Sequence, residues 1–177
     1  MSVSSSLEER KKAMPVSMPV AVIMERRESK NIWVDEVWTA VGVTGDTQWD
    51  TDEQAGVRVI NDQDDMQQLL YPGFNITLYV DECESYYHNI VLPDPGVYVI
   101  TRDNDDGVPV PYIVTPSFDE ANAYLECEGE AFTVPMPPEL YRWMEEFVLQ
   151  NYAPEKRVKR KRKDWRKEGH EGPGFKL

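Results

Sequence analysis

Long apolar runs are missing from this chain of 177 residues, and cysteine is rare. No stretch approaches the ~20 consecutive apolar residues of a transmembrane helix, and residues 1–13 contain no apolar segment of the kind an export signal needs. The two cysteines, Cys83 and Cys127, allow one disulfide but no disulfide framework, so we expect both thiols to be reduced. These absences predict a cytoplasmic protein without a membrane span.

Motifs of phosphate, nucleophile and metal chemistry are absent as well. The patterns GxxxxGKS/T, GxGxxG and GxSxG do not occur, which excludes phosphate-binding loops and nucleophile elbows of those kinds. No His or Cys pair has the short spacing of a zinc site, and Cys83 and His88 are expected to be structural neighbours rather than a catalytic pair. The acidic stretch 103–106 beside Gly107 lacks the bidentate Glu of a calcium loop and predicts a solvated turn. We therefore expect no metal, no cofactor and no catalytic residue, and a non-enzymatic role is favoured over an enzyme.

Basic residues are almost missing from the middle of the chain. Between residues 31 and 154 there are three cations, Arg58, Arg102 and Arg142, against twenty-four Asp and Glu. Residues 155–177 hold ten of the nineteen Lys and Arg and four of the thirty-two acids, so the tail is positive in a chain of net charge -13. An acidic body repels phosphate backbones and anionic lipids and attracts basic partners. Nucleic-acid binding is therefore expected only through the tail.

Short apolar and alternating segments predict an antiparallel sheet. The segment 74–81 has apolar residues at every second position, which is the period of a strand with one buried face. The segment 85–92 is rich in aromatic and β-branched residues and follows an acidic turn, so we expect it to pair with 74–81 as a hairpin. Pro109 and Pro111 confine the strand at 112–114 to a sheet edge or a strand start. Further strands are predicted at residues 19–24, 36–43, 57–60, 97–102 and 131–134, with loops at 25–29 and 44–56.

Two segments near the C-terminus have the period of a helix. Ser117 with Glu120 fits a capping box, which predicts a short helix at 118–125. Pro in the first turn and a following acid predict a second helix from residue 137 to about 152. Its apolar residues repeat at i, i+3, i+4, i+7 and i+8 as one inward stripe: Leu140, Trp143, Met144, Phe147 and Val148.

These elements predict one α+β domain over residues 18–153. We expect a curled antiparallel sheet, barrel or sandwich-like, with the C-terminal amphipathic helix packed on it. Residues 1–17 lack periodicity and are expected to be a disordered leader, and residues 154–177 a disordered basic tail.

Acids and aromatic residues in the predicted sheet leave a ligand pocket open as an alternative. Glu82 and Glu84 lie close together, and paired carboxylates can do general acid and base work, although such pairs also arise by chance among thirty-two acids. Seven aromatic residues are expected to be core and cross-strand pairs, with the lining of a pocket as the alternative: Trp33, Trp38, Tyr71, Phe74, Tyr79, Tyr86 and Tyr87.

The only dense cationic feature is a basic run at residues 156–163. Its candidate binding residues are Lys156, Arg157, Lys159, Arg160, Lys161, Arg162 and Lys163, with Trp165 close behind. Such a run can bind nucleic acid or anionic lipid by releasing counterions, or it can dock on an acidic protein surface. The ring of Trp165 can stack on a base or sit in a partner's groove. The run can equally stay solvated or fold back on the acidic body, so all three interpretations remain open.

Several stretches in order resemble a known protein family. They are Met18 to Val20, Met24 to Glu28, Trp33 and Trp38, Asp81 and Glu82 with Tyr86, Tyr87 and Asn89, Thr115 to Ser117 with Glu120 and Ala121, Val134 to Pro138, and Lys156 with Arg157. Together they resemble an uncharacterised proteobacterial domain of unknown function that is often encoded near genes for formate dehydrogenase and its maturation. The resemblance covers residues 18 to 162 and implies an accessory or assembly factor for that molybdenum enzyme, without catalytic residues to carry over.

The leading expectation is therefore a non-enzymatic accessory or adaptor protein in the bacterial cytoplasm. Its partner is expected to be a protein, and the resemblance implies a formate dehydrogenase subunit or maturation factor. One alternative is a small-molecule-binding domain or an enzyme that uses acids near Glu82, and another is polyanion binding through the basic tail.

Overall fold

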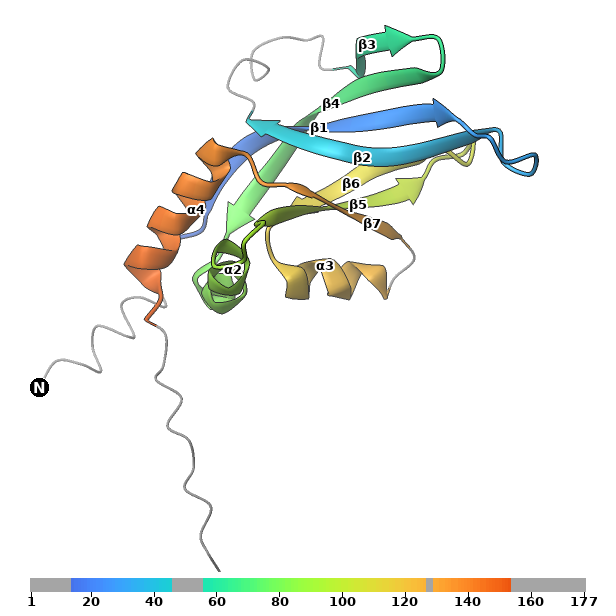
Figure 1. Ribbon diagram of the computed structural model, residues 1–177. Coiled ribbons are helices and arrows are strands. Elements are labelled where there is room, and N and C mark those ends of the chain that lie inside the picture. Colours follow the sequence, from blue (N-terminus) through green and yellow to red (C-terminus); the bar gives the residue numbers. More distant parts are fainter. Residues whose placement is uncertain (1–13, 46–55, 127–128, 154–177) are drawn as a thin grey trace, which may run out of the picture.

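The computed structural model describes residues 14–45, 56–126 and 129–153. In chain order the elements are β1 (Val16–Glu28), β2 (Glu36–Gly45), β3 (Arg58–Gln63), β4 (Met66–Leu78), η1 (Val80–Glu82), α2 (Cys83–Ile90), β5 (Gly96–Asp103), β6 (Pro109–Thr115), α3 (Phe118–Leu125), β7 (Glu130–Pro135) and α4 (Pro138–Asn151). A four-stranded sheet has the order β2-β1-β4-β3 and a three-stranded sheet the order β6-β5-β7, and every pairing is antiparallel. Figure 1 shows the two sheets stacked, with α3 below the smaller sheet and α2 and α4 at one end.

The mixed α+β class agrees with the sequence prediction, but the sheets do not close into a barrel. Strands β4 and β6 lie close together, as do β2 and β7, yet no ladder joins either pair. Two prolines in β6, Pro109 and Pro111, remove backbone donors, and β4, although continuous, contains Pro72 and Gly73 where its register with β1 shifts. Gly73 has a φ of 89°, a conformation open to glycine at little cost. No ladder crosses the seam between β4 and β6, and this overturns the barrel alternative.

One hydrophobic cluster contains residues of both sheets and of two helices. The sheets contribute fully buried side chains from β1, β4 and β5, and α2 contributes Tyr86, which has no exposed surface. Helix α4 contributes four residues of the predicted stripe, whereas the fifth, Trp143, is only partly buried. The buried stripe residues are Leu140, Met144, Phe147 and Val148.

Strand β1 is longer at both ends than the alternation of apolar residues predicts. It begins at Val16, inside the predicted leader, and ends at Glu28, so the predicted loop at 25–29 is mostly strand. The charged residues continue the strand because they find partners on the sheet. Arg27 donates to the Glu25 carboxylate, and the Gln68 amide on β4 donates to the same carboxylate at 2.8 Å.

The predicted hairpin of residues 74–81 and 85–92 is wrong, because the second segment forms helix α2. Cys83, Tyr86 and Asn89 recur every three residues and are all buried, which is a helical period concealed by β-prone residue types. The Tyr86 hydroxyl accepts the backbone N–H of Tyr79 at 3.2 Å, which ties the helix to the end of β4. The residue types of this segment therefore favour a strand, whereas the spacing of its buried residues correctly indicates a helix.

Strand β4 begins at Met66, eight residues before the strand predicted at 74–81, and ends at Leu78, whereas α3 and the edge position of β6 agree with the sequence. Helix α3 has the predicted bounds, and the Ser117 hydroxyl accepts the backbone N–H of Glu120 as a cap should. The Glu120 carboxylate does not complete the capping box, since it accepts from the Thr115 hydroxyl instead. Strand β6 lies at a sheet edge, as its prolines predict.

Some predictions fall outside the described residues. These are most of the leader, the centre of the loop at 44–56, Cys127, the basic run at 156–163 and Trp165. In the part of the chain that the structure describes, no helix is long and apolar enough to cross a membrane.

Candidate protein-interaction site

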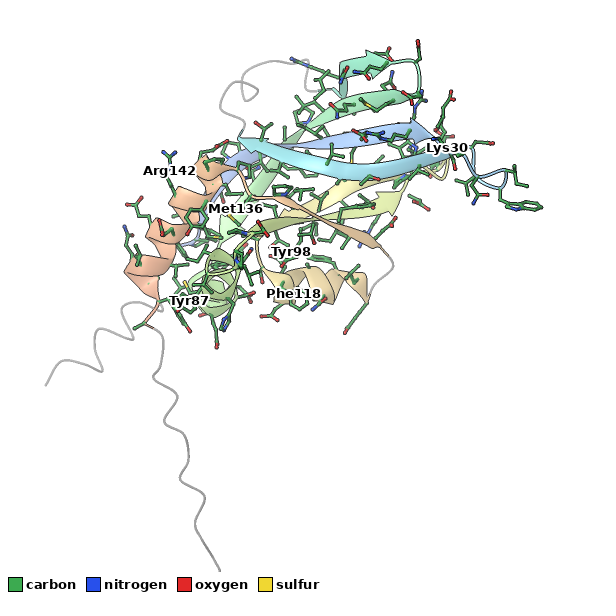
Figure 2. All side chains as sticks on the ribbon, viewed as in Figure 1. Lys30, Tyr87, Tyr98, Phe118, Met136 and Arg142 are labelled. Carbon is green, nitrogen blue, oxygen red and sulfur yellow. The ribbon has the colours of Figure 1, made fainter. Side chains whose placement is uncertain are left out.

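The turn between β1 and β2 exposes three consecutive apolar side chains, which we call the hairpin tip. Ile32 is 87% exposed, Trp33 85% and Val34 45%. Figure 1 shows this turn projecting from the end of the molecule opposite α4, and Figure 2 labels Lys30 where the projection starts. Scattered exposed apolar residues are ordinary, but three adjacent ones on a projecting turn make the hairpin tip a candidate interaction site.

The backbone of the hairpin tip is held by hydrogen bonds within the turn. Ser29 N–H donates to the Asp35 carbonyl at 3.0 Å, and Val34 N–H donates to the Asn31 carbonyl at 3.2 Å. The Asn31 side-chain oxygen also accepts the backbone N–H of Trp33 at 3.1 Å. An Asx turn of this kind satisfies the backbone locally, so the apolar side chains are not needed to hold the turn.

Acidic residues surround the hairpin tip on two turns. Glu28 and Asp35 lie on the β1–β2 turn, and Asp64 and Asp65 lie on the neighbouring β3–β4 turn. The two turns are joined, since Glu28 N–H donates to the Asp65 carbonyl at 3.1 Å. Lys30 is the one cation within the β1–β2 turn. Two arginines lie beside these acids, since Arg26 pairs with Glu36 at 3.2 Å and Arg27 with Glu25. Acids still outnumber cations on the two turns and the adjoining strand ends, which favours a partner with basic residues.

A hollow of about 440 Å³ lies inside the β1–β2 turn. Its lining includes Ile32 and Val34 together with the polar residues Ser29 and Asn31. A partner side chain that enters this hollow would contact both kinds of group. Apolar residues at the centre of a polar rim are the usual composition of a protein-binding surface.

A second concave feature lies at the seam between the two sheets, and we call it the seam cleft. It has a volume of about 340 Å³. Strand β4 and the residue after it line one side, β6 lines another and α3 the third: Gly73, Phe74, Asn75, Thr77 and Tyr79, then Tyr112, Ile113 and Val114, then Glu120 and Tyr124. The carboxylate in this cleft is that of Glu120, not of the Glu82 or Glu84 singled out from the sequence.

Glu82 instead belongs to a polar cluster between α2 and α3. The Ser117 hydroxyl lies 2.9 Å from a Glu82 carboxylate oxygen and 3.1 Å from the Ser85 hydroxyl. Ser117 has no exposed surface, so it cannot meet a substrate. In the described residues no buried side-chain polar atom lacks a hydrogen-bond partner. The cluster therefore holds two helix starts together rather than presenting a reactive group.

The Cys83 thiol is buried and is not activated. Burial and the nearby charge of Asp81 raise the pKa of Cys83 to about 11, so the thiol stays protonated at neutral pH. His88 lies 3.7 Å from the Glu84 carboxylate and is exposed. Cys83 and His88 lie on the same helix, but their contacts are with other residues, Cys83 with the Tyr79 carbonyl and His88 with Glu84, so the structure does not pair them as the sequence prediction expected.

The seven aromatic residues do not form one pocket. Tyr86 is core, and Trp38, Tyr71 and Tyr87 are partly buried beside the core. Phe74 and Tyr79 line the seam cleft, whereas Trp33 is at the hairpin tip. Within the described ranges, no group of three or more His, Cys, Asp or Glu could hold a metal ion.

Sequence reasoning missed both concave features. Ile32 and Val34 flank Trp33, and three adjacent apolar residues are typical of a buried segment. Composition alone does not show that they are exposed. The polar residues Ser29, Lys30 and Asn31 directly before them are the signal that could have indicated a projecting turn. For the seam cleft, Glu120 was noticed only as part of a helix cap.

One comparison with known proteins gave a match. Residues 19–163 match the model of a family described as "Protein of unknown function (DUF3305)". No curated protein and no solved structure matches the chain. The matched region contains the hairpin tip, the seam cleft and the basic run.

Proposed function

Since the chain belongs to this family, DUF3305, whose description names no activity, we propose a function from the surface of the molecule. The protein is an accessory or adaptor protein that binds a partner protein through the hairpin tip. The two sheets serve as a sandwich-like support, with α4 packed on them, from which the tip projects.

The observation that supports this function is the exposure of Ile32 and Trp33 on a turn whose backbone is already ordered. An ordered turn loses little conformational entropy on binding, so most of the apolar burial remains available as affinity. Tryptophan is also among the residues that contribute most to protein interfaces.

The partner surface should combine an apolar pocket with basic residues at its edge. The pocket would take the Trp33 ring, and the basic residues would face Glu28, Asp35 and the two acids of the β3–β4 turn. Complementary charge at the rim mainly speeds association and selects the partner, while the buried ring slows dissociation.

We propose a formate dehydrogenase subunit or maturation factor as the partner, and the bacterial cytoplasm as the place. This identification rests on the resemblance of the sequence stretches given above and on nothing in the geometry. The surface argument stands without it, because any partner with the stated chemistry would fit the hairpin tip.

Affinity purification of the full chain from its native bacterium tests the proposal when variants are compared. Trp33→Ala should reduce recovery of the specific partner at least tenfold. Leu149→Ala is the matched control, because Leu149 is 77% exposed on α4 at the opposite end of the molecule. Recovery with this control should equal that of the wild type.

Two outcomes would contradict the proposal. Equal recovery of the same partner by the wild type and Trp33→Ala would remove the hairpin tip from the interface. Partner recovery that is the same in 0.5 M salt as in 0.1 M salt would exclude the charge complementarity. High salt screens exposed charges over a few ångströms, so an interface that depends on them should weaken.

The seam cleft supports a second candidate function, the binding of a small molecule. Its volume of about 340 Å³ is at the lower end of ligand pockets, and Glu120 is the charged group that would orient a ligand. A metabolite that raises the Tm of the wild type but not that of Tyr112→Ala would support this function. The third alternative, polyanion binding, rests on the basic run alone and predicts nucleic-acid binding that is lost when the run is neutralised.

A further inference from the structure

We propose that the seam cleft is the docking site of the chain's own basic run, residues 156–163. The run would lie in an extended conformation along β4 and place a Lys or Arg side chain against Glu120. This inference concerns a different surface from the hairpin tip and does not depend on the proposed function.

The free edge of β4 is the first observation. β3 pairs with β4 only as far as Leu70, and β1 takes the other edge of β4 through Leu78. In an antiparallel strand alternate residues direct their backbone N–H and C=O away from a given neighbour. Among the described residues no strand pairs with this edge between Gly73 and Thr77, and β6 lies across the seam cleft from it. An extended segment can bind such an edge by adding main-chain hydrogen bonds.

The lining of the seam cleft is the second observation, and it suits a cation. Three tyrosines, Tyr79, Tyr112 and Tyr124, surround the single charged side chain, Glu120. One Glu120 oxygen, Oε2, accepts the Thr115 hydroxyl, and the other has no partner among the hydrogen bonds of the described residues. One of the rings already meets a cation, since the Arg102 guanidinium carbon lies 3.7 Å from the Tyr112 ring centroid. Carboxylate and aromatic rings together favour Lys and Arg.

The path of the chain is the third observation. The Tyr152 ring at the end of α4 lies 5.2 Å from the Tyr87 ring on α2. Helix α2 starts at Cys83, directly after η1, and the Tyr86 hydroxyl binds the backbone of Tyr79 in the cleft wall. Figure 1 shows the end of α4, helix α2 and the end of β4 gathered in one corner of the molecule, and Figure 2 labels Tyr87 there.

Reach and charge then select the occupant. Helical rises of 1.5 to 2 Å per residue place Tyr79 roughly 20 Å from Tyr152 along this path. An extended chain covers ~3.3 Å per residue, so about seven residues after Ala153 bridge that distance and bring the middle of the basic run to the cleft. A tethered segment is also present at a high effective concentration, of order millimolar, which a free basic peptide rarely reaches.

Hydrogen exchange on the full chain tests the docking directly. The variant has the seven basic residues of the run changed to Gln, and these changes leave the folded body untouched. Those backbone amides of residues 73–77 that are not bonded to β1 should exchange about tenfold faster in this variant than in the wild type, because their bonds to the run are lost. Amides of β5, which is paired on both sides, should not change.

A matched control separates this effect from general charge. The leader carries three consecutive cations, and their change to Gln (R10Q, K11Q, K12Q) should leave the exchange of residues 73–77 at the wild-type rate. Equal exchange in the wild type and the neutralised run overturns the proposal, as does an equal effect of the leader variant. Protection that disappears on dilution also overturns it, because the occupant would then be a second copy of the chain.

Carbodiimide cross-linking provides the second measurement. This reagent joins a carboxylate to an amine in contact, so tryptic peptides should contain Glu120 joined to Lys159, Lys161 or Lys163. The cross-link should remain in Glu84→Gln, whose carboxylate lies outside the cleft, and fall at least fivefold in 0.5 M salt. Cross-links from the run only to other acids, such as Asp64 and Asp65, would overturn the proposed site even if the run is bound.

Discussion

The hairpin tip exposes apolar side chains, whereas the junction of α2 with α3 buries polar ones. At the tip, Ile32 and Trp33 are exposed while the turn backbone bonds to itself. At the junction, Ser85, Asn89 and Ser117 are buried and every one has a partner. The difference separates two roles, because side chains at the junction hold the fold together, whereas side chains at the tip can be changed without disturbing it.

The largest effect is expected at Phe147 of α4, which packs against α2 within the hydrophobic core. Its ring packs edge-on against Tyr86 of α2, with the centroids 6.4 Å apart. Phe147→Ala should lower the free energy of unfolding by about 3 to 5 kcal/mol, since it removes a buried ring and leaves a cavity. Trp143→Ala should cost less, because Trp143 is only partly buried. Urea denaturation of both variants measures the difference, and equal losses would contradict the assigned burial.

Asn89 comes next. Its side-chain NH₂ donates to the carbonyls of Gly96 and Pro116 at 2.8 Å each, and its oxygen accepts the N–H of Gly96 at 3.1 Å. Asn89→Ala leaves these buried groups without partners and should cost about 3 kcal/mol. Exposed Asn31 at the hairpin tip is the matched control, and Asn31→Ala should cost less than about 1 kcal/mol. A reversed order in thermal or urea unfolding would refute the contrast between the two regions.

A smaller effect on stability, which depends on pH, is expected for Glu25→Gln on β1, the strand that leads to the hairpin tip. The hydrogen bonds from Arg27 and then Gln68 hold the pKa of Glu25 below its ordinary value of 4.5. A carboxylate whose pKa is lowered by folding stabilises the protein fully at pH values above its ordinary pKa. This stabilisation is lost as the pH falls through the lowered pKa of the folded state. The wild type should therefore lose more stability than Glu25→Gln between pH 5 and pH 3. Parallel urea midpoints over that range would show that the carboxylate has no such role.

The smallest effect on stability is expected for Trp33→Ala. The side chain is exposed and the turn is held by its own hydrogen bonds, so the free energy of unfolding should change by less than about 0.5 kcal/mol. The same variant is expected to lose the partner, so the pair of measurements distinguishes binding from folding. A loss of 2 kcal/mol or more would mean that the ring supports the hairpin.

Local signals were enough for the elements whose chemistry is local. The caps and period of α3 and α4, and the prolines of β6, identified these elements from a few neighbouring residues. Helix α2 was misread because Tyr86 and Tyr87 favour strands by type, and only the spacing of Cys83, Tyr86 and Asn89 carries the helical period. Strand β1 was cut short because partners for Glu25 and Arg27 depend on pairing with β4, forty residues further on.

The hairpin tip and the seam cleft both depend on tertiary arrangement, so the sequence could not reveal them. The seam cleft exists because β4 and β6, which are distant in sequence, lie side by side without pairing. The hairpin tip is exposed because nothing in the described residues covers it, and an exposed Trp33 has the same local sequence as a buried one. The separation of an acidic body from a basic run is a property of the sequence itself, and the docking proposal rests on this complementary charge.

The prolines of β6 also bear on the pairing of sheet edges between chains. An unpaired strand edge with all its donors in place is a template for another chain, and repeated addition of chains leads to fibrils. Pro109 and Pro111 remove two donors from β6, the strand whose edge closes no ladder. The edge of β6 is therefore a poorer template for further copies of the chain than an edge with all its donors in place.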